Sequence, residues 1–295
     1  MTESLDVAVD TIKLDCNFEK SVTYHFELKK TSFRCSRASR KYLICHTIFM
    51  RPSDRLSDKG LSTDVIFLDL SKAFDSVPHE RLLTKIHAYG IQGPLLSWLR
   101  SVLTNRYQGV VLRGHDSSWT SLLSGLPQVA LLGPILFLIY INNISRNIMS
   151  DTKLFANDMK VYRLLEDTKE DAEELQKDLP YLESWSNDWQ LKFNTDICEV
   201  MRISKKNDYL SAQYHLCGNQ LKTVSEVKDL GIYITSNLSW SIQANKCANK
   251  ANSVLGFIRR TVGPKDPELF SKLFYRSLAR QILEYVLLSS LVSAP

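Results

Sequence analysis

The chain has 295 residues, enough to bury a sizeable core in one large domain or in two to three subdomains. Hydrophobic residues make up 44% and charged residues 23%, an ordinary balance for a globular protein, and the net charge of +5 permits a polyanionic partner without requiring one. Six dispersed cysteines, with no C-x-x-C pair, argue against a zinc or dithiol redox site and favour an intracellular compartment, nucleus or cytoplasm.

The first 63 residues give little indication of a fold. Residues 1–10 are acidic and lack the basic-then-apolar order of a signal peptide. Residues 29–41 carry six Lys and Arg side chains and no acid. Such a run can contact a phosphate backbone, although a solvated basic arm is the simpler interpretation.

The clearest strand is predicted over residues 65–68, where the run V-I-F-L is typical of a strand buried on both faces. Asp69 follows directly. A carboxylate at this place is costly to bury unless a cation meets it. Asp69 therefore either caps the turn into residues 71–73 or is presented by the strand end to a cleft.

Two helices and a hairpin are predicted next. Apolar side chains recur at helical spacing over residues 82–89, where Gly90 is a usual C-terminal cap, and again over residues 95–103. Residues 107–113 and 119–123 then predict a hairpin.

Residues 131–141 are strongly apolar. The run is too short to span a bilayer and is interrupted by Gly133 and Pro134, so we expect no membrane span. Proline is favoured in the first turn of a helix, and the segment therefore predicts a buried core helix entered through Pro134.

Residues 153–156 and 159–162 predict two strands joined by a tight turn at Asn157 and Asp158, since both residue types tolerate positive φ. Asp158 can thus be a turn residue and nothing more. A long helix is then predicted from Thr168, with Pro180 inside its apolar face at a cost of about 3 kcal/mol or a kink. Further strands and helices are predicted over residues 191–203, 227–234, 240–260 and 267–288.

Six sequence blocks follow one another along the chain. They are F-L-D-L-S-K-A-F-D-S-V-P-H (67–79), S-G-L-P-Q…L-G-P-I-L-F-L-I-Y-I-N (124–142), L-F-A-N-D-M-K-V-Y (154–162), W-x-x-x-W-x-L-K-F-N (185–194), L-G-I-Y-I-T-S-N-L-S-W (230–240) and L-F-Y-R-S-L-A-R-Q-I-L-E-Y (273–285). In order and spacing they resemble the reverse transcriptases of non-LTR (LINE-type) retrotransposons. The resemblance covers roughly residues 64–290.

The resemblance implies an α+β fold: a right-hand polymerase palm, with an antiparallel sheet backed by helices, followed by a helical thumb. It assigns residues 64–225 to the palm with a helical finger-side insertion, and residues 226–295 to a partial thumb. The fingers are incomplete or absent, because residues 1–63 show no recognisable fingers block and form either a fingers remnant or an unrelated segment.

The resemblance also implies template-directed DNA synthesis with an RNA template, a DNA primer, deoxynucleotides and two Mg²⁺ ions, which prefer carboxylate oxygens. By motif match, Asp69 and Asp158 are the catalytic, metal-binding carboxylates. Phe74 is the aromatic gate under the sugar, and Gln128 touches the incoming nucleotide or its template base.

The departures from the family pattern lie at positions that bind metal or nucleotide, or transfer a proton, in the family. The family hairpin reads F-A-D-D, and its first aspartate is the metal ligand that faces Asp69; here that position is Asn157. Val129 replaces a glycine after Gln128, and Ile197 stands where the family has a lysine credited with protonating the leaving pyrophosphate. A site that neutralises phosphoryl charge with two cations loses a principal anion, and we expect a rate loss of several orders of magnitude.

Three interpretations stay open from the sequence. The first is a reverse transcriptase that has kept part of its fold and lost its chemistry, which scattered departures favour. The second is a weakly active polymerase in which Asn157 and Asp158 suffice. The third is a nucleic-acid-binding module without catalysis, for which salt-sensitive binding survives Asp69→Ala.

Overall fold

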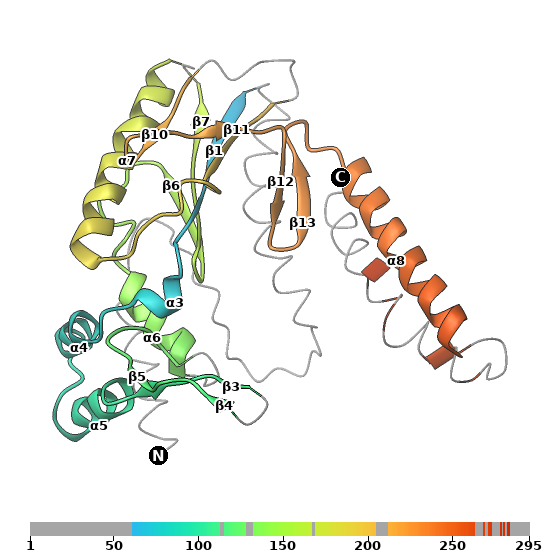
Figure 1. Cartoon of the computed structure of the whole chain (residues 1–295). Helices are drawn as coiled ribbons and strands as arrows, with labels where there is room; N and C mark the ends of the chain where they lie inside the picture. The colour runs from blue at the N-terminus through green and yellow to red at the C-terminus, as the bar shows by residue number, and fades with distance from the viewer. Residues whose placement is uncertain are drawn as a thin grey trace.

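The computed structural model describes residues 61–262, apart from 113–114, 128–131, 167–168 and 205–211, together with a few single positions beyond residue 262. The basic run at 29–41 and most of the helix expected over 267–288 lie outside these described residues. Figure 1 shows a central sheet with the long helix α7 along one side, and a hairpin and the helix α8 on the other.

A five-stranded sheet is the centre of this fold, with the strand order β11-β8-β1-β7-β6. The strands are β1 (Ser62–Asp69), β6 (Asp151–Phe155), β7 (Asp158–Leu165), β8 (Glu199–Ile203) and β11 (Lys222–Thr223). Neighbours pair antiparallel, except that β11 runs parallel to β8. The predicted strand at 65–68 is confirmed as the middle of β1, and so is the mixed α/β fold built on an antiparallel sheet.

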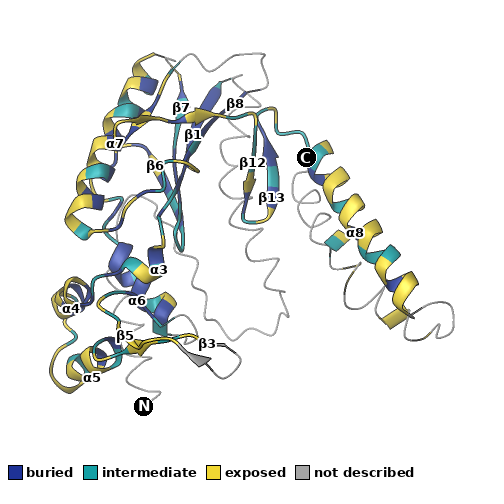
Figure 2. Ribbon diagram, viewed as in Figure 1, coloured by how far each residue is buried: buried dark blue, intermediate teal, exposed yellow. Residues whose placement is uncertain are grey.

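Each face of the sheet carries a hydrophobic core. On one face, Ile66 and Leu68 of β1 belong to the large cluster that includes the buried side of α7 (Glu170–Trp189). On the other face, Val65 and Phe67 pack with Ile232 and Ile234. Burial on both faces is why β1 reads as a continuous apolar run rather than an alternating one (Figure 2).

The second face is covered by a hairpin of β12 (Glu226–Asp229) and β13 (Ile232–Thr235). One strand was predicted at 227–234, and that prediction is wrong: Leu230 and Gly231 both have positive φ and form a two-residue turn. A buried ion pair joins this hairpin to the sheet, with Lys160 Nζ of β7 lying 2.5 Å from Asp229 Oδ2.

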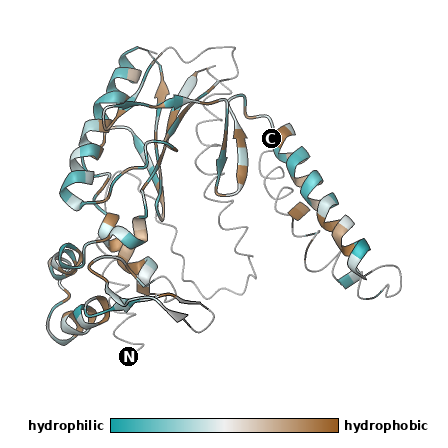
Figure 3. Ribbon diagram, viewed as in Figure 1, coloured by the Kyte–Doolittle hydropathy of each residue, from teal (hydrophilic) through white to brown (hydrophobic). Residues whose placement is uncertain are grey.

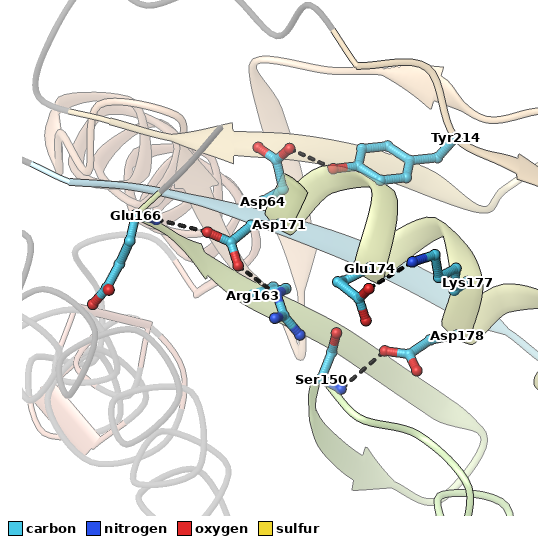
Figure 4. Close-up of polar contacts among 9 residues, drawn as sticks. All are labelled: Asp64, Ser150, Arg163, Glu166, Asp171, Glu174, Lys177, Asp178 and Tyr214. Atoms are coloured by element: carbon cyan, nitrogen blue, oxygen red, sulfur yellow. Dashed lines mark hydrogen bonds and ion pairs between the residues drawn. The ribbon is translucent and has the colours of Figure 1, made fainter. Parts of the chain in front are cut away.

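Polar contacts fasten α7 to the sheet (Figure 4). The buried carboxylate of Asp178 accepts the backbone N–H groups of Met149 and Ser150 at 2.8 and 2.9 Å. Asp171, near the start of α7, accepts Arg163 Nε at 2.8 Å and the Glu166 N–H at 2.9 Å. The long helix predicted from Thr168 is confirmed as Glu170–Trp189, and Thr168 itself lies outside the described residues. Two of its carboxylates bind the strands and turns beside it.

The placement of Pro180 differs from the prediction. The helix continues through it, and Pro180 lies on the exposed side of α7, while the neighbouring Asp178 and Leu179 are buried. Proline removes one backbone hydrogen bond wherever it lies in a helix interior, but on the exposed side its ring displaces no core side chain.

We expect Pro180→Ala to raise the free energy of unfolding by about 1–2 kcal/mol, because alanine restores the N–H donor and the gain exceeds the lost restriction of the unfolded chain. Urea unfolding of the two proteins measures the difference. Lys177→Ala, one turn earlier on the same exposed side, is the control and should leave stability unchanged; an equal or lower stability of Pro180→Ala contradicts the prediction.

Three helices form a separate group beside the end of the sheet: α4 (His79–Ala88), α5 (Gly93–Leu103) and α6 (Leu132–Ile141). All three were predicted, and α6 includes Pro134 in its first turn, as expected of a core helix. Within the described part of the chain, no helix combines the length and the apolar character that crossing a membrane needs.

The smaller elements complete the described chain. The predicted hairpin is confirmed as two short ladders, β2 (Tyr107–Gln108) with β5 (Thr120–Ser121) and β3 (Val111–Leu112) with β4 (His115–Asp116). A second hairpin pairs β9 (His215–Leu216) with β10 (Asn219–Gln220). The short helix α3 (Ala73–Ser76) follows β1, and α8 (Ser241–Val262) confirms the helix predicted over 240–260.

Lys85 of α4 is buried among groups of α6 and α7. Its Nζ donates to the Tyr140 carbonyl and to Asn143 Oδ1, and it lies 4.0 Å from the centre of the Trp189 ring. Burial, helped by the charge of Arg146, lowers the pKa of Lys85 to about 7. The ammonium ion thus joins three helices at an electrostatic cost.

This lowered pKa predicts a pH dependence of stability. Between pH 7 and about 10.4, where an ordinary lysine titrates, the unfolded chain binds more protons at residue 85 than the folded chain, so the free energy of unfolding rises with pH. We expect Lys85→Met to flatten this rise in urea unfolding measured across that range. An unchanged slope in the variant contradicts the assignment.

Candidate active site

The two predicted catalytic carboxylates are brought together by the sheet. Asp69 is the last residue of β1 and Asp158 the first of β7, and the antiparallel register places them directly opposite each other. Directly opposed side chains lie on the same face with Cβ atoms about 5 Å apart. Strand alternation puts them on the face of Phe67 and Lys160, the one that the β12–β13 hairpin covers in part.

Asn157 contacts Asp69. Its Nδ2 donates to Asp69 Oδ1 at 2.8 Å. The tight turn was predicted at Asn157 and Asp158, but Phe155 pairs with Asp158, so the turn consists of Ala156, with φ of 54°, and Asn157. Asp158 is therefore a strand residue, and Asn157 reaches across from the turn.

The environment of Asp69 disfavours its charge. Burial raises the pKa of Asp69, and the hydrogen bond from Asn157 offsets part of that effect by stabilising the carboxylate. A cation is the group that normally stabilises such a carboxylate; here a neutral amide donates to it instead.

The segment between α7 and β8 lies beside the end of β1. Asn194 N–H donates to the Asp69 carbonyl at 2.9 Å. Cys198 is buried, which raises the pKa of its thiol to about 11. Ile197, at the position of the family lysine, has 54% of its surface exposed, so an apolar side chain faces solvent where the family has a cation.

Phe74, the predicted sugar gate, is held in α3. Its ring stacks on Phe137 of α6 with centroids 4.5 Å apart, and its carbonyl accepts the Leu126 N–H at 2.8 Å. The residue after Phe74 also contacts the segment before α6: the Asp75 carbonyl accepts a hydrogen bond from Ser124 Oγ at 2.8 Å. Gln128 and Val129 lie outside the described residues.

Comparison with known proteins decides the family. The sequence pattern of "Reverse transcriptase (RNA-dependent DNA polymerase)" matches residues 13–234, three quarters of the chain. This chain belongs to the reverse transcriptase family. The match begins well before β1, so the family pattern extends into residues 13–63, where no block of the family is recognisable by eye.

The chain is similar to proteins of non-LTR retrotransposons, which confirms the resemblance. It is 31% identical over 86 residues to the Pol polyprotein of the type-1 element R2 of Popillia japonica, covering 29% of this chain and 14% of the relative. It is 26% identical over 189 residues to the probable RNA-directed DNA polymerase of transposon BS of Drosophila melanogaster, covering 60% of this chain and 20% of the relative. The jockey polymerase of the same species is 24% identical over 59% of this chain and 20% of its own. The chain thus spans a fifth or less of these relatives.

Among solved structures, telomerase of Candida tropicalis with a fragment of telomeric RNA is 10% identical, with a TM-score of 0.49 over 88% of this chain and 44% of that one. Telomerase of Candida albicans is 12% identical, with a TM-score of 0.47 over 97% of this chain and 44% of that one.

The residues of the site do not fit the two divalent metal ions that reverse transcriptases use. Asn157 presents an amide donor to Asp69, where a metal needs an oxygen ligand. Among the residues that the structure describes, no three His, Cys, Asp or Glu side chains gather closely enough to hold a metal ion. Asp69 and Asp158 alone supply two of the anionic ligands that such a pair of ions shares.

Sequence reasoning missed the contacts that hold the site in place. His79 Nε2 lies 2.8 Å from the Gly125 carbonyl, and no short-range pattern connects residues so far apart in the sequence. The positive φ of Gly125, +94°, was in principle readable, since glycine in a Ser-Gly-x-Pro turn often marks a close backbone approach.

Proposed function

We propose that this chain is a reverse transcriptase palm that binds an RNA template and a DNA primer but has lost most of its nucleotidyl transfer activity. In this proposal residues 64–225 form the palm and residues 226–295 a partial thumb, while residues 1–63 are either a fingers remnant or an unrelated segment. Family membership and the antiparallel sheet that pairs Asp69 with Asp158 support the palm assignment.

One observation carries the loss of activity: Asn157 Nδ2 donates to Asp69 Oδ1 at 2.8 Å. A second carboxylate at residue 157 would share Mg²⁺ with Asp69, whereas the amide is itself a donor and adds no charge. Because the phosphoryl transfer depends on cations held by these anions, we expect a rate several orders of magnitude below that of the family.

Primer extension tests this proposal. The chain is mixed with poly-rA/oligo-dT, dTTP and either Mg²⁺ or Mn²⁺, and both the bound complex and the products are measured. We expect a bound complex and no extension, with the same result for Asp69→Ala. Extension that Asp69→Ala abolishes would show a working polymerase, and absence of any complex would exclude template binding.

A second candidate, a nucleic-acid-binding module without chemistry, is supported by α8. Its 22 residues hold four cations and no acid. Most of the helix is exposed and hydrophilic (Figures 2 and 3). Lys246 is tied to Glu226 and to the Tyr233 ring, whereas Lys250, Arg259 and Arg260 are exposed.

This candidate predicts binding to an RNA–DNA hybrid that weakens steeply with salt. Replacing Lys250, Arg259 and Arg260 with alanine should lower the slope of log affinity against log salt by about 1 for every phosphate group that these side chains neutralise. Lys177→Ala on the far side of the sheet is the matched control and should change nothing. A slope unaffected by the triple substitution would remove α8 from the interface.

A further inference from the structure

The turn after β1 and the segment before α6 are locked together by a set of hydrogen bonds. Gly125 N–H donates to the Val77 carbonyl at 2.9 Å, and Leu126 N–H to the Phe74 carbonyl at 2.8 Å. Together with the Ser124–Asp75 contact, these bonds make residues 124–126 a short partner strand for residues 74–78, with a bridge between Pro78 and Ser124.

The side chain of His79 adds one more hydrogen bond between the two segments. It is 5% exposed, and its Nε2 lies 2.8 Å from the Gly125 carbonyl. A carbonyl oxygen only accepts, so Nε2 carries a proton and donates. A hydrogen bond between two buried groups in this position fixes the direction of the Gly125 peptide, and therefore of the Leu126 N–H that holds Phe74.

Residues 124–126 and 74–78 are packed so closely that a side chain larger than hydrogen at residue 125 would meet the Asp75 backbone. Gly125 has φ of +94°, and a Cβ at this position would lie 3.0 Å from the Asp75 carbonyl oxygen. Phe74 is meanwhile fixed at its ring by Phe137. The Phe74 backbone and ring are thus held by separate contacts, and His79 is the buried side chain that sets the backbone contact.

We propose that His79 is a positioning residue for nucleotide selection: it holds Gly125 and Leu126 so that Phe74 lies where it separates deoxyribose from ribose. The inference rests on the proposed function and on the motif match that assigns Phe74 to the position under the sugar of the incoming nucleotide. It concerns the segment around Phe74 rather than the hairpin turn at Asn157, where the family metal ligand is replaced.

The test measures the affinities for dUTP and UTP, which differ only at the 2′-hydroxyl, both as Mg²⁺ complexes, on the chain bound to poly-rA and a dideoxy-terminated oligo-dT primer, by calorimetry. We expect the wild type to prefer dUTP. His79→Leu removes the donor and should lower the preference about threefold to tenfold, the worth of one buried hydrogen bond. His79→Gln retains a donor and should keep most of it.

An unchanged dUTP/UTP affinity ratio in His79→Leu, or a wild type without any preference, overturns the proposal. If His79→Leu does not fold, Ser124→Ala removes one exposed hydrogen bond of the same lock and should lower the ratio by a smaller factor; no change there also overturns it. Failure of the proposed function is seen separately, as absence of the primer–template complex, and nucleotide affinities are then measured on the free chain.

Discussion

Asn157→Asp is expected to turn a site that is stable without metal into one that depends on it. In the presence of EDTA the variant should be less stable than the wild type, because the hydrogen bond to Asp69 is replaced by repulsion between two partly buried carboxylates, worth about 1–3 kcal/mol. Mn²⁺ or Mg²⁺ should restore the stability. Thermal unfolding with and without the cation measures both effects.

The same substitution should tighten Mn²⁺ binding strongly. Two unit charges about 4 Å apart attract by about 4 kcal/mol at an effective dielectric constant near 20, and a dication doubles this energy. Desolvation of the carboxylate and the ion offsets much of it, so we expect affinity to rise about a hundredfold or more. Asn157→Ala, which loses the hydrogen bond without adding charge, is the control and should gain no dependence on metal. Equal metal dependence in both variants would contradict the assignment of residue 157 to the metal position.

Asp64→Ala should be the most destabilising single change in the sheet, lowering the free energy of unfolding by about 3–5 kcal/mol. Asp64 of β1 is fully buried and accepts Arg202 Nε and Nη2 at 2.8 and 3.0 Å, and Tyr214 Oη donates to it at 2.6 Å (Figure 4 draws the Tyr214 contact). The alanine variant leaves a buried guanidinium without its counterion.

Two controls distinguish the loss of the Arg202 counterion from a general sensitivity of this protein to substitution. Glu174→Gln breaks the exposed pair with Lys177, also drawn in Figure 4, and should leave stability unchanged. Asp64→Leu combined with Arg202→Met should lose less than Asp64→Ala alone, because no charge is left unpaired. Chemical unfolding measures all three, and a small loss for Asp64→Ala would show that Arg202 finds water or another partner.

Local sequence patterns predicted most elements, whereas the pairing of the two carboxylates was implied by the family resemblance. The apolar run before Asp69, the helical stripe of α5 and the apolar α6 were readable because each satisfies one period over many residues. The turn of the β6–β7 hairpin was placed one residue late, because Ala156, a residue type that rarely adopts positive φ, takes that conformation here and Phe155 pairs with Asp158.

Contacts between distant residues were not predictable in this way. Asp64 lies just before the strand predicted at 65–68, and nothing in the local pattern points to its partners Arg202 and Tyr214, which lie on β8 and beyond it. The apolar spacing of α4 says nothing about Lys85, and only the packing of α6 and α7 around it shows its burial. For Asn157, the sequence indicated the lost ligand, and the structure added that its amide donates to Asp69.

The central claim is that this palm does not bind the pair of metal ions. Electron paramagnetic resonance tests it most directly, by counting the Mn²⁺ ions bound to the wild-type chain in the presence of poly-rA, a dideoxy-terminated oligo-dT primer and dTTP. We predict that Asp69→Ala leaves the number of bound ions unchanged, because Asn157 gives Asp69 an amide donor and adds no anionic ligand beside it. A coupled pair of Mn²⁺ ions on the wild type that Asp69→Ala removes would contradict this prediction, and would show that Asn157 and Asp158 suffice for a two-metal site.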